Sequence, residues 1–404
     1  MKLNKWTVGL AALGVVSLAS AVKAEESGSA LMTALSSTTF SGYVDTSMHW
    51  NAGTGNDFAA PYKFNQGKSD GFNLNVVQLT IAKPLDENEW AAGYHVDLWF
   101  GPDANVLGTA STFHNSSGEA DNSSDLAIRQ AYVALRMPIG NGIDWKIGVF
   151  DSIIGYESVA SPNNPNYTRS YGHSIEPQTH TGVLASYRFC DNVSVSVGVA
   201  NTTGPHINAR GHGEDEHAES FKTYMGSIAL TAPDNWGFLA GSTLYGGVVN
   251  GFNDNEAGQD NEATTTSWYA GATLATPVTG LRFGASFDHL KRREQFGGGS
   301  PTAWSAAGYA SYQATEKLSL HLRGEILRDR TGELGFRSSG SKAEVMALTA
   351  TAQYDLWKNV ISRLEVRWDH GSNGRYFGAA NSNNEGEPTK KNEVLVAANI
   401  IYKF

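Results

Sequence analysis

The chain has 404 residues, with 40 acidic against 30 basic side chains and a formal net charge of −10. This acidic balance excludes a nucleic-acid partner, because no basic stripe is available to neutralise phosphates. Cys190 is the only cysteine, which excludes an internal disulfide and a cysteine metal cluster.

The first residues have the pattern of a secretory signal peptide. Lys2 and Lys5 form a short basic region, an apolar run over 8–19 follows, and Val22 and Ala24 stand where signal peptidase requires small residues. We predict export and cleavage after Ala24, which leaves 25–37 as a short N-terminal periplasmic segment. The alternative is a membrane anchor, but the apolar run is far shorter than the roughly 20 residues that span a bilayer.

The remainder, 38–404, is predicted to be a single domain of β-strands. Short segments alternate apolar and polar side chains, and this period of two is typical of strands with two different faces. No apolar run in this part is long enough for a membrane helix, and the other membrane-spanning fold is a closed barrel. The predicted strands are 38–51, 71–84, 89–101, 125–138, 143–150, 180–190, 192–202, 220–233, 235–251, 263–277, 280–294, 302–315, 317–330, 343–357, 360–371 and 390–404.

The connections between these segments alternate strictly between long and short. The short ones are rich in the turn residues Asp, Asn, Pro and Gly, as in Asp86-Glu87-Asn88 and Gly140-Asn141-Gly142. Bacterial barrels pair tight periplasmic turns with longer extracellular loops, and an even strand number returns both termini to the periplasm. We predict an all-β fold, a transmembrane antiparallel up-and-down β-barrel of about 16 strands. A soluble sandwich or propeller is the alternative, although neither would require such regular alternation of loop length.

The two faces of the strands differ in charge. In 360–371, Leu364, Val366 and Trp368 suit lipid, while the residues between them are charged. A charge on the lipid face near the membrane midplane costs roughly 2–4 kcal/mol, so the charged face must line the barrel interior. The lumen arginines are Arg129, Arg136, Arg188, Arg282, Arg323, Arg363 and Arg367, with acids Asp97, Asp288, Glu325, Glu365 and Asp369 among them. Because both signs are present, either an electrostatic pathway or a bracing charge ladder would explain them, and anion or cation selectivity stays open.

The last strand alternates apolar residues up to a terminal phenylalanine, Phe404. This ending resembles the signal by which outer-membrane barrels are recognised for assembly. The simpler interpretation is an edge strand that happens to end in an aromatic residue. Together with the signal peptide, it favours an outer-membrane barrel inserted by the assembly machinery.

The chain resembles the OmpL-like beta-barrel porin family (beta-barrel porin-2), most clearly over 40–205. The resemblance implies an outer-membrane porin fold and gives no substrate. The segments that carry it are Ser41-Gly42-Tyr43-Val44-Asp45, Gly71-Phe72-Asn73-Leu74-Asn75, Ala92-Gly93-Tyr94-His95-Val96-Asp97-Leu98-Trp99-Phe100-Gly101-Pro102-Asp103-Ala104, Gly140-Asn141-Gly142-Ile143-Asp144-Trp145, Ile154-Gly155-Tyr156-Glu157, Glu176-Pro177 and His180-Thr181-Gly182.

The connection 151–179 is the leading candidate for a functional site. It is the longest connection and the third long one, and its Pro and Asn residues are of the kind that order a loop. We expect it to fold inward and narrow the pore, with Glu157, Arg169 and Glu176 setting the field there. The other pore-lining candidates are Asp97, Arg129, Arg282, Arg323, Glu325, Arg363 and Arg367. The alternative is a surface loop held together by its own side chains.

The segment 206–217 combines His206, His212 and His217 with three acids. These ligand types suit zinc or copper, but their spacing supports no closed site, so they are weak metal candidates and we expect no cofactor.

The predicted function is a porin, a passive channel for small hydrophilic solutes or ions. Two alternatives are a structural or adhesion barrel without an open pore and a barrel hydrolase. A hydrolase would need a serine, a histidine and an orienting group at one level, and no such motif is present. Expected partners are outer-membrane lipid and lipopolysaccharide, the assembly machinery and transported solutes, with a homotrimer as a possible assembly.

Overall fold

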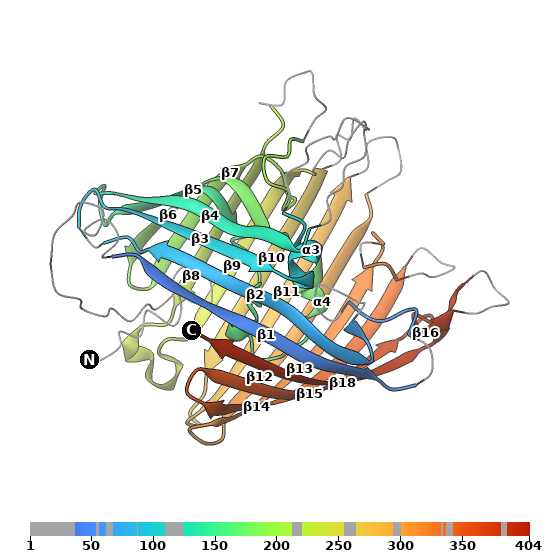
Figure 1. Ribbon diagram of the computed structural model, residues 1–404. Helices are drawn as coiled ribbons and strands as arrows, with labels where there is room; N and C mark the ends of the chain where they lie inside the picture. The colour runs from blue at the N-terminus through green and yellow to red at the C-terminus, as the bar shows by residue number, and fades with distance from the viewer. Residues whose placement is uncertain are drawn as a thin grey trace.

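The computed structural model is a closed antiparallel β-barrel (Figure 1). It describes residues 37–53, 56–61, 68–86, 88–109, 124–211, 220–253, 264–293, 300–332, 334–336, 342–380 and 386–404. The predicted signal peptide and the predicted segment 25–37 lie almost wholly outside these residues. The barrel strands are β1 (Thr39–Asn51), β2 (Gly71–Lys83), β3 (Ala92–Phe100), β4 (Leu126–Met137), β5 (Ile143–Asp151), β6 (Thr179–Cys190), β7 (Val193–Ala200), β8 (Thr223–Thr231), β9 (Thr243–Phe252), β10 (Thr264–Ala275), β11 (Leu281–Arg293), β12 (Thr302–Gln313), β13 (Leu318–Asp329), β14 (Ala343–Trp357), β15 (Val360–Gly371) and β18 (Asn392–Lys403).

The predicted count of 16 strands is confirmed. Each strand pairs with its neighbours in sequence, and β1 closes the barrel on β18, from Tyr43 opposite Lys403 to Asn51 opposite Leu395. The pairing continues to the end of the chain, because Gly42 and Phe404 exchange two backbone hydrogen bonds of 3.0 Å. Closure leaves no sheet edge, as a membrane requires when no water can satisfy free backbone groups.

The predicted division into two faces is also present. On β15, Leu364 is 58% exposed and Val366 is 47% exposed, whereas Glu365 and Arg367 between them are fully buried. The apolar set therefore covers the outside of the barrel and the charged set lies inside it. No helix among the described residues is long and apolar enough to cross a membrane.

The strand predicted at 235–251 was wrong in its first part. Residues Asp234–Leu239 form η3, two short 3-10 turns joined by a kink at Trp236 and Gly237, and β9 begins only at Thr243. Gly237 has φ of 61° and Gly241 has φ of 76°, far from the negative φ of regular strand backbone. This connection is therefore longer than the predicted three-residue turn. It lies at the same end of the barrel as the C-terminus (Figure 1).

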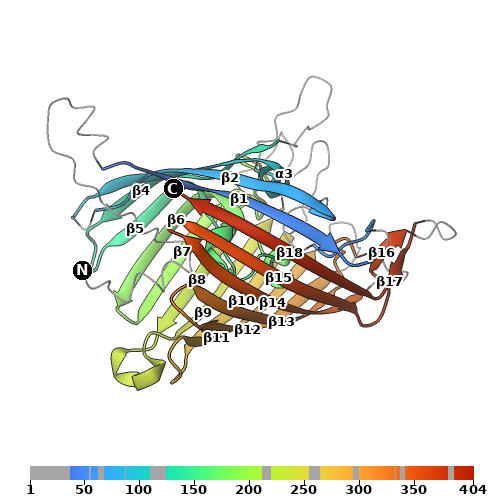
Figure 2. The ribbon, with the colours of Figure 1, turned by 60° about the horizontal axis from the view of Figure 1, so that its bottom comes forward.

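The long connections contain short elements that the sequence did not indicate. They include α3 (Pro102–Leu107), η2 (Ser161–Asn163), α4 (Tyr171–Ile175) and a small hairpin of β16 (Phe377–Ala380) and β17 (Pro388–Lys390). The hairpin projects at the opposite end of the barrel from the C-terminus (Figure 2). An isolated bridge between Phe58 and Gly378 ties the first long connection to this hairpin.

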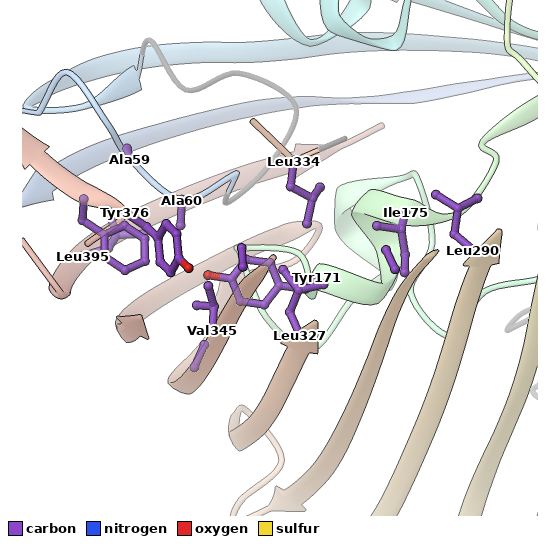
Figure 3. Packing of buried hydrophobic residues seen from close by; sticks show 14 of the residues in the cluster. Ala59, Ala60, Tyr171, Ile175, Leu290, Leu327, Leu334, Val345, Tyr376 and Leu395 are labelled. Atoms are coloured by element: carbon purple, nitrogen blue, oxygen red, sulfur yellow. The ribbon is translucent and has the colours of Figure 1, made fainter. Parts of the chain in front are cut away.

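A hydrophobic cluster lies inside the barrel rather than between layers. Tyr171 and Ile175 from the third long connection pack with Leu327 and Val345 of the barrel wall (Figure 3). Tyr376 and further residues of the first, seventh and eighth long connections complete this cluster. One side of the lumen is therefore filled by protein.

Candidate functional site

The third long connection, residues 152–178, is called L3 here and lies within the barrel. Its middle part contacts inward-facing side chains of β1, β13, β14 and β15, on the other side of the lumen from β5 and β6, which it joins (Figure 1). Partners separated by 198 positions in sequence, such as Tyr171 and Asp369, form a 2.6 Å hydrogen bond. The inward fold expected of this loop is present in the structure.

L3 is also ordered by its own side chains. Asn164 accepts from the backbone N–H of Ser158 and donates to the carbonyls of Ser158 and Ala160, at 2.8–2.9 Å. Ser170 caps α4 by accepting from the N–H of His173. The Asn and Ser residues thus shape the loop before it meets the wall.

Glu365 on β15 is the main acceptor for L3. Its carboxylate, fully buried, accepts the backbone N–H of Tyr167 at 2.6 Å and that of Thr168 at 2.9 Å. The hydroxyls of Thr168 and Thr351 donate to the same carboxylate, each at 2.6 Å. Four donors satisfy the buried charge, and such charge-assisted bonds are roughly twice as strong as neutral ones.

Arg323 on β13 is the second wall residue that binds L3, and it contacts the same Thr168 as Glu365 does. Its guanidinium forms ion pairs with Glu157 of L3 at 2.8 Å and with Glu325 of its own strand at 3.0 Å. It also donates to the carbonyls of Thr168 and Arg169 at 2.8 and 3.2 Å. The planar guanidinium can supply donors in these several directions at once, which a lysine could not.

Two further arginines of β15 bind L3 carbonyls. Arg363 donates to Ser161 at 3.2 Å and to Asn164 at 2.6 Å. Arg367 donates to the carbonyl of Arg169 at 2.6 Å, pairs with Asp369 and lies over the Tyr171 ring at 4.8 Å. The predicted wall residues Arg323, Glu325, Arg363 and Arg367 are therefore brought together, and their shared partner is L3.

The side chains of the three predicted charges of L3 are buried, Glu157 and Arg169 in this contact and Glu176 beside β11. The guanidinium of Arg169 donates to the carbonyls of Tyr167 and Val159, at 3.3 and 3.1 Å. Burial alone would raise the pKa of Glu157, but Arg323 and then Arg169 hold it below its ordinary value. Burial, and then Asp288, raise the pKa of Glu176 well above its ordinary value. Burial and Arg169 lower the pKa of His173 in α4 to about 3, so this ring is neutral.

A second charged cluster lies on β3 to β5. Arg129 forms ion pairs with both Asp97 and Asp151, and His95 and Gln130 also contact the Asp97 carboxylate at 3.0 Å. The ammonium of Lys146 stands 4.7 Å above the Tyr132 ring. Asp97 and Arg129 are thus joined to each other, on a part of the wall separate from the L3 anchor.

Other predicted residues stand apart. Arg282 is exposed and lies beside the short turn before β11, away from both clusters. His212 and His217 lie outside the described residues, and the described ones contain no group of three or more potential metal ligands. Sequence reasoning missed Ser47 and His49, which bind the Tyr167 hydroxyl at 2.9 Å. Their inward position on β1 was the available signal.

A glycine makes room for one arm of L3. A Cβ at Gly284 on β11 would overlap the hydroxyl of Tyr156, whose ring stacks on Tyr309 with centroids 4.1 Å apart. The two arms of L3, 152–159 and 173–178, line a small pocket that is open to solvent, together with Asp151 at the end of β5. Asp151, Glu157 and Glu176 contribute to its lining. The loop therefore leaves an open space beside it within the barrel.

Comparison with solved structures shows the same fold at low sequence identity. An anion-selective porin from Comamonas acidovorans is 11% identical, with a TM-score of 0.58 over 91% of this chain and 99% of that one. The DcaP channel of Acinetobacter baumannii is 14% identical, with a TM-score of 0.55 over 91% and 97%. OmpT of Vibrio cholerae in its trimer form is 12% identical, with a TM-score of 0.54 over 91% and 99%. A search of curated proteins gave no match.

The model of the family described as beta-barrel porin-2, OmpL-like, matches residues 37–404. This range contains every strand of the barrel and the whole of L3. The chain therefore belongs to the OmpL-like beta-barrel porin-2 family and is an outer-membrane porin, a passive channel protein.

Proposed function

We propose that this porin passes small hydrophilic solutes or ions and that L3 is its constriction. The observation that supports the constriction is the attachment of L3, across the lumen, to Glu365 and three arginines. A loop fixed by charge-assisted bonds to the far wall keeps its position as solutes pass. The width of the channel is then set by L3 and the wall that faces it.

The inward face of β6 and β7 carries small polar side chains. Ser186 and Ser196 face the lumen there as half-buried residues and join their hydroxyls at 2.8 Å. Hydroxyl groups keep such a surface wet and bind solutes weakly enough to release them, as conduction requires. This supports diffusion of hydrophilic solutes, and the proposal includes no catalytic step.

The purified protein in a planar lipid bilayer is expected to give stepwise conductance that is linear in voltage. A water-filled lumen in a barrel of this size conducts ions in both directions without a gating step. The second candidate function is a structural or adhesion barrel, favoured by the internal hydrophobic cluster around Tyr171. Correctly folded protein that inserts into the bilayer without any conductance steps would favour that candidate and reject the channel.

The proposal extends to export and assembly. The signal peptide 1–24, the short segment 25–37 and the barrel domain 38–404 remain a proposed division of the chain. The backbone pairing of Phe404 with Gly42 supports recognition of the last strand by the assembly machinery, since that strand completes the barrel. We also propose contact with lipopolysaccharide at the outer surface and a homotrimer, for which the trimer form of OmpT is the supporting comparison.

A further inference from the structure

The returning arm of L3 meets the wall through two acids. Glu176, directly after α4, faces Asp288 on β11, and the side chains of both acids are buried. A bond between two carboxyl groups requires a proton on one of them, because a carboxylate can only accept. The helix itself lies against this part of the wall, since a Cβ at Gly172, one turn before Glu176, would overlap Asp288 Oδ2.

The described surroundings of the pair contain no compensating cation. Among the described residues, no lysine or arginine forms an ion pair with either carboxyl, and the nearby imidazole of His173, 3.9 Å from Glu176, is neutral. Glu157 adds a negative charge on the same loop, but Arg323 neutralises it. The backbone of Tyr156 on L3 and the side chain of Tyr269 on β10 also lie beside the pair, and neither carries a positive charge.

We propose that Glu176 and Asp288 share one proton and that this pair latches the returning arm of L3 to β11, so that the channel responds to pH. The proposal rests on L3 as the constriction. Loss of the shared proton places two buried negative charges side by side, which favours release of the arm. Glu176 and Asp288 are positioning residues for the loop, and neither needs to touch the solute.

The direction of the response follows from the position of each charge. The pKa of Glu176 is raised in the docked loop, so its contribution to docking is complete below its ordinary value of about 4.5 and is lost as pH rises through the raised value. The pKa of Glu157 is lowered, so its contribution is present above that ordinary range and is lost in stronger acid. L3 is therefore held most firmly in weak acid and is released towards alkaline pH.

The experiment measures hydrogen-exchange protection factors for the L3 amides of the full-length barrel in lipid between about pH 5 and about pH 9. The amide of Ser170, which donates to Glu157 at 2.7 Å, is a suitable reporter. In the wild type, protection is expected to fall with rising pH, by up to about tenfold per unit. In Glu176→Gln, whose amide can donate to Asp288 at every pH, protection is expected to stay constant. Glu316→Gln, an exposed site in a short turn, should behave as the wild type.

Asp288→Asn provides a second variant, because its amide donates to Glu176 and equally removes the shared proton. A pH-independent wild type, or a decline that persists in both Glu176→Gln and Asp288→Asn, would overturn the latch. Conductance recorded over the same pH range separates the two proposals. Protection that falls while conductance stays constant supports the latch and rejects L3 as the constriction, whereas a parallel rise of conductance supports both.

Discussion

Replacing residues 153–177 of L3 by a four-residue Gly-Ser linker is expected to raise the single-channel conductance by about threefold. The barrel tolerates this change because β5 and β6 are already paired at Asp151 and Thr179, and the N–H of Ser152 donates to the carbonyl of Gln178 at 2.9 Å. A short linker can therefore close the hairpin without moving either strand. The wall arginines and Glu365, no longer buried under the loop, become hydrated in the wider lumen.

Planar-bilayer recordings in the same salt solution measure this change. The matched control shortens the connection that contains η3, at the other end of the barrel. This connection has no buried residues in η3, so its shortening should leave conductance unchanged. Unaltered conductance in the L3 variant, with the barrel folded, would mean that the narrowest point lies elsewhere.

Arg323→Met is expected to weaken the docking of L3 by about 3–5 kcal/mol, because Glu157 and Glu325 lose a buried partner. The carbonyl of Thr168 loses this donor at the same time, and that of Arg169 keeps the bond from Arg367 alone. The protection factors of the Tyr167, Thr168 and Tyr171 amides should fall strongly, and the open-channel current should become noisier as the loop moves. Arg323→Lys should restore little, since an ammonium cannot reach these acceptors together.

The same strand provides the control for this prediction. Arg328 pairs with Glu344 at 2.9 Å, but the arginine side chain is 43% exposed, and such surface pairs contribute less than about 1 kcal/mol. Arg328→Met should therefore leave the protection of L3 and the current noise as in the wild type. Equal protection of L3 in the two methionine variants would refute the anchoring role of Arg323.

The strands could be predicted because their signals are local. Alternation along β15 and the turn residues between strands depend only on neighbouring positions, so the strand number and the third long loop followed from the sequence. The start of β9 did not, because Trp236 and Phe238 continue the alternating pattern while Gly237 bends the backbone. The alternating side chains predict a strand there, but the positive φ of Gly237 prevents the backbone from extending.

The partners of L3 could not be predicted, since closure of the barrel determines them. Arg282 and Arg323 look alike in sequence, as inward-facing arginines on neighbouring parts of the wall. Only the height of each along its strand separates the exposed Arg282, near a short turn, from Arg323, which meets L3. The sequence also could not reveal that Glu176 faces Asp288, because the two are far apart along the chain.

Tyr167 connects the strands on both sides of the last strand of the barrel. Its N–H donates to Glu365 on β15 and its hydroxyl to Ser47 on β1, at 2.6 and 2.9 Å, while β18 lies between these two strands. The loop therefore acts as an internal strap over the junction where the first and last strands of the chain meet. Resistance of that junction to opening depends on bonds along the strands and, in addition, on a segment inserted from the middle of the chain.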